Sequence, residues 1–261
     1  MQSFGPDDFE GRTLFYPATH LLNDQPKFFR AALLFITAKS LGQKPAALMD
    51  LALAIELLHT SSLVHDDILD GDSRRRRRRA VHVKYGVETA IIAGDALISK
   101  AMQLAAQYGE GVNVEVALAA MQMCAGELLD YNIQKGVLRA TLKRYMDVAR
   151  LKSASLIASS CSSASAYTES KWSSELRAFG NNIGIAFQIK DDIRDYRNRK
   201  PTGKGSGACN IVDILAAEKG SGSAMERAEA LNRRYVDRAI ASIETIKGLA
   251  PLADYAMTVR V

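Results

Sequence analysis

The chain has 261 residues, of which 48% are hydrophobic and 24% charged, and its formal net charge is +5. This is the composition of an ordinary soluble globular chain that is long enough for one large domain. The three cysteines are odd in number and widely spaced, which excludes a metal-type cysteine pair and indicates reduced packing residues in a cytoplasmic protein. No shift in composition marks a second domain, so we expect a single domain over residues 1–261.

The N-terminal segment MQSFGPDDFEG is acidic and lacks an apolar core, so it predicts no signal peptide. The most apolar stretch, residues 46–64, carries Asp50, Glu56 and His59. Charged side chains in that stretch argue against a membrane span.

Helical periodicity recurs from about Lys27 onward, and strand signals are almost absent. Breaks in the pattern fall near Gly42, Gly71, Gly86, Gly111, Gly136, Ser170 and residues 198–210. A last helix is predicted at about residues 224–247. The serine-rich tract SASLIASSCSSASA fits a helix whose small residues allow close packing. These features predict an all-α, single-domain helical bundle.

The most charged stretch, HTSSLVHDDILDGDSRRRRRRAVH, spans residues 59–82 and places Asp66, Asp67 and Asp70 next to an arginine run at 74–79. On a helix, Asp66 and Asp70 share a face and repel each other by about 0.2–0.5 kcal/mol. Mg²⁺ suits such a pair, because it prefers a couple of carboxylates together with waters and phosphate oxygens. Arginine forks match the same phosphate. The alternative for one such motif is a polar helix end with a solvated charge run.

The same i, i+1, i+4 spacing recurs at Asp191, Asp192 and Asp195, again after an apolar helical run. Two helix faces of this kind, far apart in the chain, are best interpreted as opposite walls of one cavity.

The chain resembles the trans-isoprenyl diphosphate synthases, or polyprenyl synthetases, over nearly its whole length. The stretches that carry the resemblance, in the family's order, are LVHDDILDGDSRRRRRRAVHVKYG, AIIAGDALIS, GELLD (126–130), RLKSASL (150–156) and FQIKDDIRDY. The resemblance implies a bundle of the isoprenoid synthase type with its active site in a central cavity, Mg²⁺ as cofactor, and a homodimer.

The resemblance also implies a reaction. Isopentenyl diphosphate is joined head to tail to an allylic diphosphate (dimethylallyl, geranyl, farnesyl or geranylgeranyl diphosphate), and the product is five carbons longer. Departure of the allylic diphosphate requires stabilisation of its charge, and no side-chain nucleophile is needed.

Site residues follow from the matched motifs. The implied metal ligands are Asp66, Asp67, Asp70, Asp191, Asp192 and Asp195. The implied contacts to the allylic substrate and its diphosphate are Arg75, Lys152, Ser153, Gln188 and Lys200. The implied contacts to isopentenyl diphosphate are Lys27, Arg30, His59 and Arg76. Of these, Asp66, Asp70, Arg75, Lys152, Gln188 and Asp191 are expected to act in catalysis.

Two segments depart from the family's pattern. In HLLNDQPKFFRAALL only Lys27 and Arg30 remain of three expected cations, and a basic helix start with snorkelling side chains is the alternative. In YRNRKPTGKGSGACNIV an expected aspartate is missing, which leaves Lys200 and Lys204 as the cations of a glycine-rich loop that we expect to act as the lid.

The positions four and five before Asp66 are Ser62 and Ser61, both small. In the resembling family larger residues there shorten the product, so we predict a product of C20 or longer.

Three other interpretations stay open. The altered segments favour a non-catalytic partner subunit of a heteromeric synthase. A class I terpene cyclase would share the fold, but DDIRD argues against it. Nucleic-acid binding by the arginine run lacks interleaved aromatic residues and a recognisable binding fold.

Overall fold

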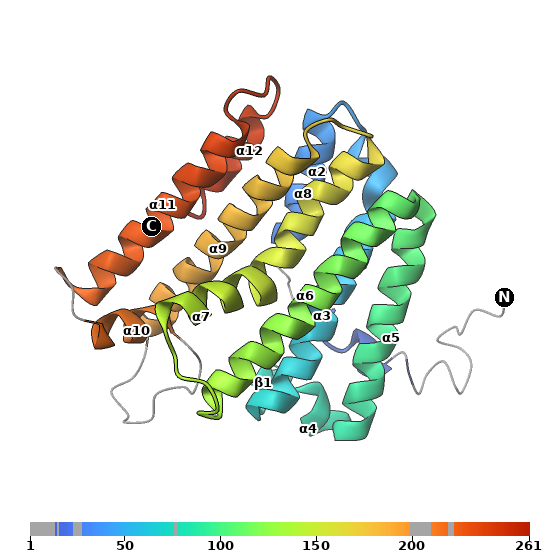
Figure 1. Ribbon diagram of the computed structural model, residues 1–261. Coiled ribbons are helices and arrows are strands. Elements are labelled where there is room, and N and C mark those ends of the chain that lie inside the picture. Colours follow the sequence, from blue (N-terminus) through green and yellow to red (C-terminus); the bar gives the residue numbers. More distant parts are fainter. Residues whose placement is uncertain (1–13, 15, 23–27, 76–77, 199–209, 219–221) are drawn as a thin grey trace.

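The computed structural model describes residues 14, 16–22, 28–75, 78–198, 210–218 and 222–261, and this part of the chain is almost entirely helical (Figure 1). The long helices are α2 (Phe29–Ser40), α3 (Met49–Asp70), α5 (Val87–Ala105), α6 (Glu110–Gln134), α8 (Ser155–Tyr167), α9 (Ser173–Asn198) and α11 (Ala224–Ile243). The shorter elements are η1 (Pro45–Leu48), β1 (Arg74–Arg75), β2 (Arg78–Arg79), α4 (Val81–Tyr85), η2 (Ala106–Tyr108), α7 (Leu142–Val148), the π-helical turn η3 (Ala149–Ala154), α10 (Ile211–Ala217) and α12 (Ala250–Met257). The all-α fold class is confirmed.

The long helices form a bundle (Figure 1). Helix α9 packs between α11 and α8, α8 also packs on α6 and α2, and α3 packs on α5. Buried apolar side chains form one cluster around α3 and α5, a second between α8, α9 and α11, and a third where α9 meets η3 and α10. The C-terminal end lies against α11, where the backbone N–H of Val261 donates to Asn232 over 3.0 Å.

Both aspartate motifs lie in the last turns of their helices. In α3, Leu51, Ile55 and Leu58 form one buried stripe, and the helix stops at Gly71, whose φ of 70° is the left-handed conformation that glycine adopts readily. Helix α9 continues only three residues beyond its motif, to Asn198. Because the carboxyl end of a helix carries partial negative charge, carboxylates there are destabilised until a cation is close.

The expected breaks near Gly42, Gly71 and Gly86 coincide with helix ends. The break expected near Gly111 is two residues earlier, at Gly109, whose φ is 93°. The last long helix ends at Ile243 instead of residue 247. The sequence pattern missed the hairpin in the arginine run, in which residues 74 and 75 pair with residues 79 and 78.

Two helical stretches, Pro45–Asp70 and Glu110–Gln134, are long and apolar enough to span a membrane by length and composition alone. In the first stretch, 61% of the most apolar 18-residue segment is buried, as in a core helix of a soluble protein. In the second stretch only 22% of the corresponding segment is buried. The second stretch, α6, therefore presents an uncovered apolar face.

Candidate active site

Asp66 lies at the centre of the first carboxylate cluster, on the inner side of α3. Its side chain is only 15% exposed. Burial raises the pKa of Asp66 to about 8; Lys152 opposes this shift, and Glu127 and Asp70 add to it. Burial also raises the pKa of Asp70. With all its carboxyl groups ionised, the cluster would therefore carry more negative charge than the protein around it compensates.

Lys152 is the cation of this cluster. Its Nζ lies 2.6 Å from a Glu127 oxygen, 2.9 Å from Asp130 Oδ2 and 3.9 Å from Asp66 Oδ2. Burial lowers the pKa of Lys152, but the charges of Asp66, Asp130 and Glu127 outweigh it and raise that pKa above its ordinary value. Lys152 therefore stays charged and fixed beside Asp66.

Glu127 and Asp130 were not among the residues predicted to form the site. Both lie in the GELLD stretch of α6, three residues apart and therefore on one face. This i, i+3 pair of carboxylates on a largely apolar helix is the sequence feature from which their place in the site could have been predicted.

The π-helical turn η3 brings these groups together. A Cβ at Gly126 of α6 would lie 2.3 Å from the backbone nitrogen of Lys152, and a Cβ at Gly184 of α9 would lie 2.6 Å from Ala154. Only glycine permits these approaches, so α6 and α9 both pack directly against the backbone of η3. Single π turns inside helices are frequent at functional sites.

Ser153 connects η3 to the second aspartate motif. Its hydroxyl donates to Gln188 Oε1 over 2.6 Å, and Gln188 Nε2 donates to Asp192 Oδ1 over 2.8 Å. The consecutive residues Lys152 and Ser153 thus reach one aspartate motif each. Adjacent residues of η3 thus connect the two motifs, and a single site formed by both stays a prediction.

The outer aspartates of the second motif are accessible. The Asp191 side chain is 28% exposed and lies 3.0 Å from Arg194, and that of Asp195 is 67% exposed. Arg30, at the start of α2, lies within electrostatic reach of Asp191. Nε of Arg30 is buried without a hydrogen-bond partner among the described residues, so it is a donor that a phosphate oxygen could satisfy.

The middle aspartate of each motif has a different environment. Asp67 has no exposed side-chain surface and is ion-paired with Arg75. Asp192 is buried and accepts the backbone N–H of Ile211 over 3.0 Å, while its own backbone carbonyl accepts from Asn210. Both carboxylates have local structural contacts, although Asp67 Oδ2 is buried without a hydrogen-bond partner among the described residues, and metal ligation by either stays a prediction.

Three described arginines of the run, at positions 75, 78 and 79, bind protein groups. Arg75 also contacts Asp72 at 3.3 Å, Arg78 donates to the carbonyl of His20, and Arg79 donates to the carbonyl of Val83. These contacts fold the hairpin onto its surroundings and hold Arg75 beside the first motif.

His59 lies in α3, half-buried, seven residues before Asp66. Lys27, Arg76, Lys200 and Lys204 lie outside the described residues, and so does the glycine-rich segment predicted to be the lid.

Among the described residues, no group of three or more histidine, cysteine or acidic side chains is already gathered around a metal position. Mg²⁺ does not need one, because it is usually bound through one or two carboxylates plus waters and substrate phosphates. The hard oxygens of Asp66 and Asp70, with their excess negative charge, fit that ion.

Two aspartate motifs on separate helices, linked by a lysine-bearing π turn inside an all-α bundle, define an enzyme of the isoprenoid synthase class. The polyprenyl synthetase family model matches residues 12–242. The chain therefore belongs to the polyprenyl synthetase family and is a trans-prenyltransferase.

Similar proteins agree with this assignment. The chain is 35% identical over 235 residues to a short chain isoprenyl diphosphate synthase of Methanothermobacter thermautotrophicus, covering 84% of this chain and 72% of the relative. It is 30% identical to a geranylgeranyl diphosphate synthase of Methanosarcina mazei, and the match covers 91% of this chain and 79% of that relative. A solved geranylgeranyl pyrophosphate synthetase from Geoglobus acetivorans superimposes with a TM-score of 0.84 at 25% identity, covering 97% of this chain and 93% of that one.

Proposed function

We propose that this chain condenses isopentenyl diphosphate with an allylic diphosphate, with Mg²⁺ as cofactor, to form a trans-polyprenyl diphosphate of C20 or longer. One observation supports this most directly: Lys152 contacts Asp66 on α3, and the adjacent Ser153 is bonded through Gln188 to the motif on α9. This arrangement suits a substrate whose diphosphate lies between the two motifs.

The acidic and basic residues have separate roles in the proposed reaction. When bound at Asp66, Asp70 and Asp191, Mg²⁺ supplies a Lewis acid for the departing diphosphate. Lys152, held by Glu127 and Asp130, presents a fixed positive charge on the same side. The allylic C–O bond breaks, the double bond of isopentenyl diphosphate forms the new C–C bond, and the proton then lost passes to the released diphosphate.

Two further residues orient the substrates. Nε of Arg30, which has no hydrogen-bond partner within the described part of the chain, offers a donor to the diphosphate of isopentenyl diphosphate. Gln188 is locked between Ser153 and Asp192, so its position relative to the reacting carbons is fixed before substrate binds.

The proposed product length is based on the small residues Ser61 and Ser62 and on the names of the relatives. Both positions lie in α3, where Ser61 is buried and Ser62 donates to the carbonyl of His59 over 2.9 Å. Both side chains are small, so we expect neither to stop an elongating product beside the first motif. The relative from Methanosarcina mazei is named a geranylgeranyl diphosphate synthase, which agrees with a C20 product.

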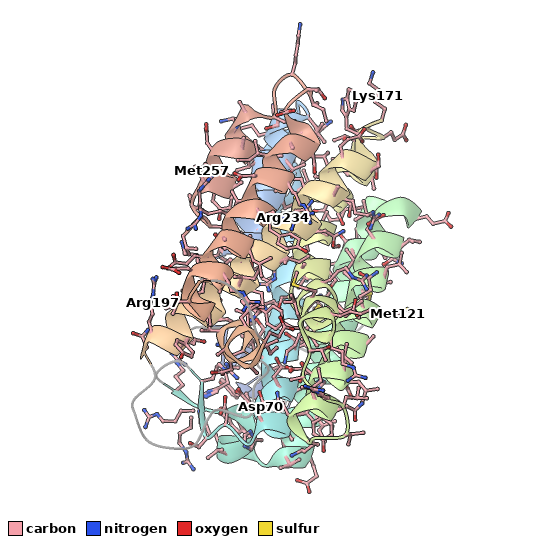
Figure 2. The ribbon with its side chains drawn as sticks, turned by 60° about the vertical axis from the view of Figure 1, so that its left-hand side comes forward. Asp70, Met121, Lys171, Arg197, Arg234 and Met257 are labelled. Atoms are coloured by element: carbon pink, nitrogen blue, oxygen red, sulfur yellow. The ribbon has the colours of Figure 1, made fainter. Side chains whose placement is uncertain are left out.

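A homodimer is the assembly we propose. Helix α6 carries an exposed apolar stripe at helical spacing, made up of Val114, Leu118, Met121 and Leu128. Met121 is 69% exposed and projects from the side of the bundle (Figure 2). A second copy covering this stripe would explain why the helix is apolar enough to resemble a membrane span. Light scattering should show a dimer for the wild type and a monomer for Met121→Lys.

We further propose a single domain without a membrane span in a cytoplasmic setting, on the basis of composition. The second candidate function is a weak or inactive partner subunit of a heteromeric synthase. The aspartate that is missing after Lys200 favours it. As such a partner subunit, the chain would show activity only when mixed with a homologous chain.

The test is a Mg²⁺-dependent assay with labelled isopentenyl diphosphate and each of the four allylic primers in turn, with products separated by chain length. Incorporation that stops when Mg²⁺ is chelated supports the synthase. A folded protein that incorporates no label with any primer would move the assignment to the partner subunit.

A further inference from the structure

A basic hollow lies on the outer face of α11, apart from the residues assigned to catalysis. Its volume is about 520 Å³, and it is lined by Ala230, Arg233, Arg234, Asp237, Arg238, Ala241 and Arg260. Arg234 and Asp70 lie well apart along the bundle (Figure 2). Their true separation is at least as large as the separation seen in this view. No part of the proposed reaction uses these side chains.

The arginines of the hollow exceed their acidic partners. Arg260 is paired with Asp237 at 2.7 Å, and Arg233 lies 3.7 Å from Glu229. The Arg238 guanidinium lies over the ring of Tyr235, 5.3 Å from its centroid. Arg234 and Arg238 have no acidic partner within the described part of the chain, so two guanidinium groups in the hollow remain uncompensated.

The arrangement along α11 keeps the space between these arginines open. Arg234 and Arg238 are four residues apart, so they share a face and repel each other. Ala230 and Ala241 flank them on that face and fill little volume. An anion between the two guanidinium groups would relieve the repulsion.

The wall opposite α11 is held in place. Lys190 of α9 donates to the carbonyl of Thr258 over 2.9 Å and to that of Arg260 over 3.4 Å. Asn232 donates to the carbonyl of Val259 over 3.2 Å. The segment that carries Arg260 is thus fixed before any ligand binds, which lowers the cost of binding.

We propose that this hollow is a binding site for a soluble diphosphate-bearing anion, separate from the prenyl transfer site. Guanidinium forks bind phosphate oxygens in pairs, and several of them converge here. A hollow of about 520 Å³ has room for a small anion of this kind.

The test is calorimetric titration of the whole protein with inorganic diphosphate, at low ionic strength and with EDTA present, so that metal-dependent binding at the aspartate motifs is absent. The wild type should show saturable binding. Arg234→Ala/Arg238→Ala should weaken it roughly tenfold or more, since charged hydrogen bonds are lost. Prenyl transfer should be unchanged in this variant.

Two further variants separate charge and geometry from general effects. Lys143→Ala/Lys171→Ala removes the same charge elsewhere on the surface and should bind diphosphate as the wild type does. Arg234→Lys/Arg238→Lys keeps the charge but loses the paired donors, so it should bind less tightly than the wild type.

The proposal fails if the wild type shows no saturable binding, or if the double alanine variant, with an unchanged melting curve, binds as tightly as the wild type. It also fails if the hollow binds vesicles containing phosphatidylglycerol but not free diphosphate, because that result would assign the surface to a membrane.

Discussion

Arg75 donates from its Nε to Asp67 Oδ1 over 2.6 Å, and the Asp67 side chain has no exposed surface. The next residue back, Asp66, contacts Lys152 instead. Adjacent aspartates in one motif therefore have different contacts: Asp67 anchors the arginine hairpin to α3, and Asp66 lies beside Lys152 in the carboxylate cluster.

Replacing Asp67 should therefore lower the free energy of unfolding more than replacing Asp72, the exposed carboxylate that also contacts Arg75. Asp67→Ala leaves Arg75 without its buried partner, and because Arg75 is itself 26% exposed we expect a loss of about 2–3 kcal/mol. Urea unfolding measures this free energy. The matched control is Asp72→Ala, which removes the exposed partner of Arg75 and should cost less than about 1 kcal/mol. Equal losses in the two variants would contradict the anchoring role.

The buried Asp66 predicts how the stability of the metal-free protein depends on pH. Its pKa of about 8 in the fold lies above the ordinary value of about 4 for an unfolded chain. The folded state therefore binds the extra proton between these values, so stability should fall as pH rises from about 4 to about 8. Added Mg²⁺ should restore stability at the upper end of this range.

Unfolding of Asp66→Asn in EDTA across the same pH range checks the assignment. The variant should lose this part of the pH dependence, whereas Asp95→Asn, which alters a carboxylate that is 66% exposed, should keep the wild-type profile. A profile for Asp66→Asn identical to that of the wild type would show that another group is responsible.

His65 sets the distance between α3 and α5 next to the first motif. A Cβ at Gly94 would lie 2.1 Å from His65 Nε2, which also lies 3.2 Å from the carbonyl oxygen of Ile91. Gly94→Ala must displace this ring, so we expect a loss of about 1–2 kcal/mol and a lower rate, although alanine is the better helix former.

The control for this change is Gly111→Ala, whose Cβ would meet Ala166 at an ordinary 3.7 Å. It should be neutral or stabilising by up to about 1 kcal/mol. Thermal unfolding and the transfer rate test both variants. If Gly94→Ala is as stable and as active as the wild type, the contact with His65 does not position the motif.

Asp192 should act through the start of α10. Asp192→Ala leaves the buried N–H of Ile211 without its acceptor, at a cost of about 1–3 kcal/mol, while Asp192→Asn can retain that bond. Hydrogen exchange of the Ile211 amide should accelerate in the alanine variant and stay slow in the asparagine variant. Equally slow exchange in both would remove the anchoring role of Asp192.

Ser61→Phe should shorten the main product, because the larger ring occupies space beside the first motif. Ser61 is only 2% exposed, so the ring must also displace neighbours, and a melting curve is needed to show that the variant is folded. Ser61→Ala is the control and should leave product length unchanged. A folded Ser61→Phe enzyme with the wild-type product would contradict the role of this position.

Much of the fold was predictable, because helical spacing is a local property. The apolar stripe of α3, the two aspartate motifs and the helix ends at Gly71 and Gly86 all follow from residues close together in sequence. The helical character of the serine-rich tract follows in the same way, and it is confirmed by α8.

The partner of each carboxylate was not predictable. Asp67 turns to Arg75 because the hairpin folds back on α3, and Glu127 reaches Lys152 because Gly126 lets α6 approach η3. Both contacts depend on how separate segments pack, which spacing along the chain does not encode. The π turn itself has no recognised signal in ARLKSA.

The central claim is that Asp66 and Asp191 serve one site. Its most direct test is the rate of labelled isopentenyl diphosphate incorporation by Asp66→Ala, Asp191→Ala and the variant with both changes. Each single change should lower the rate by about 10²-fold or more, and the double variant should be far less impaired than the product of the two losses, because residues that act as a unit are not additive. A near-wild-type rate in either single variant, or losses that multiply fully, would contradict a shared site.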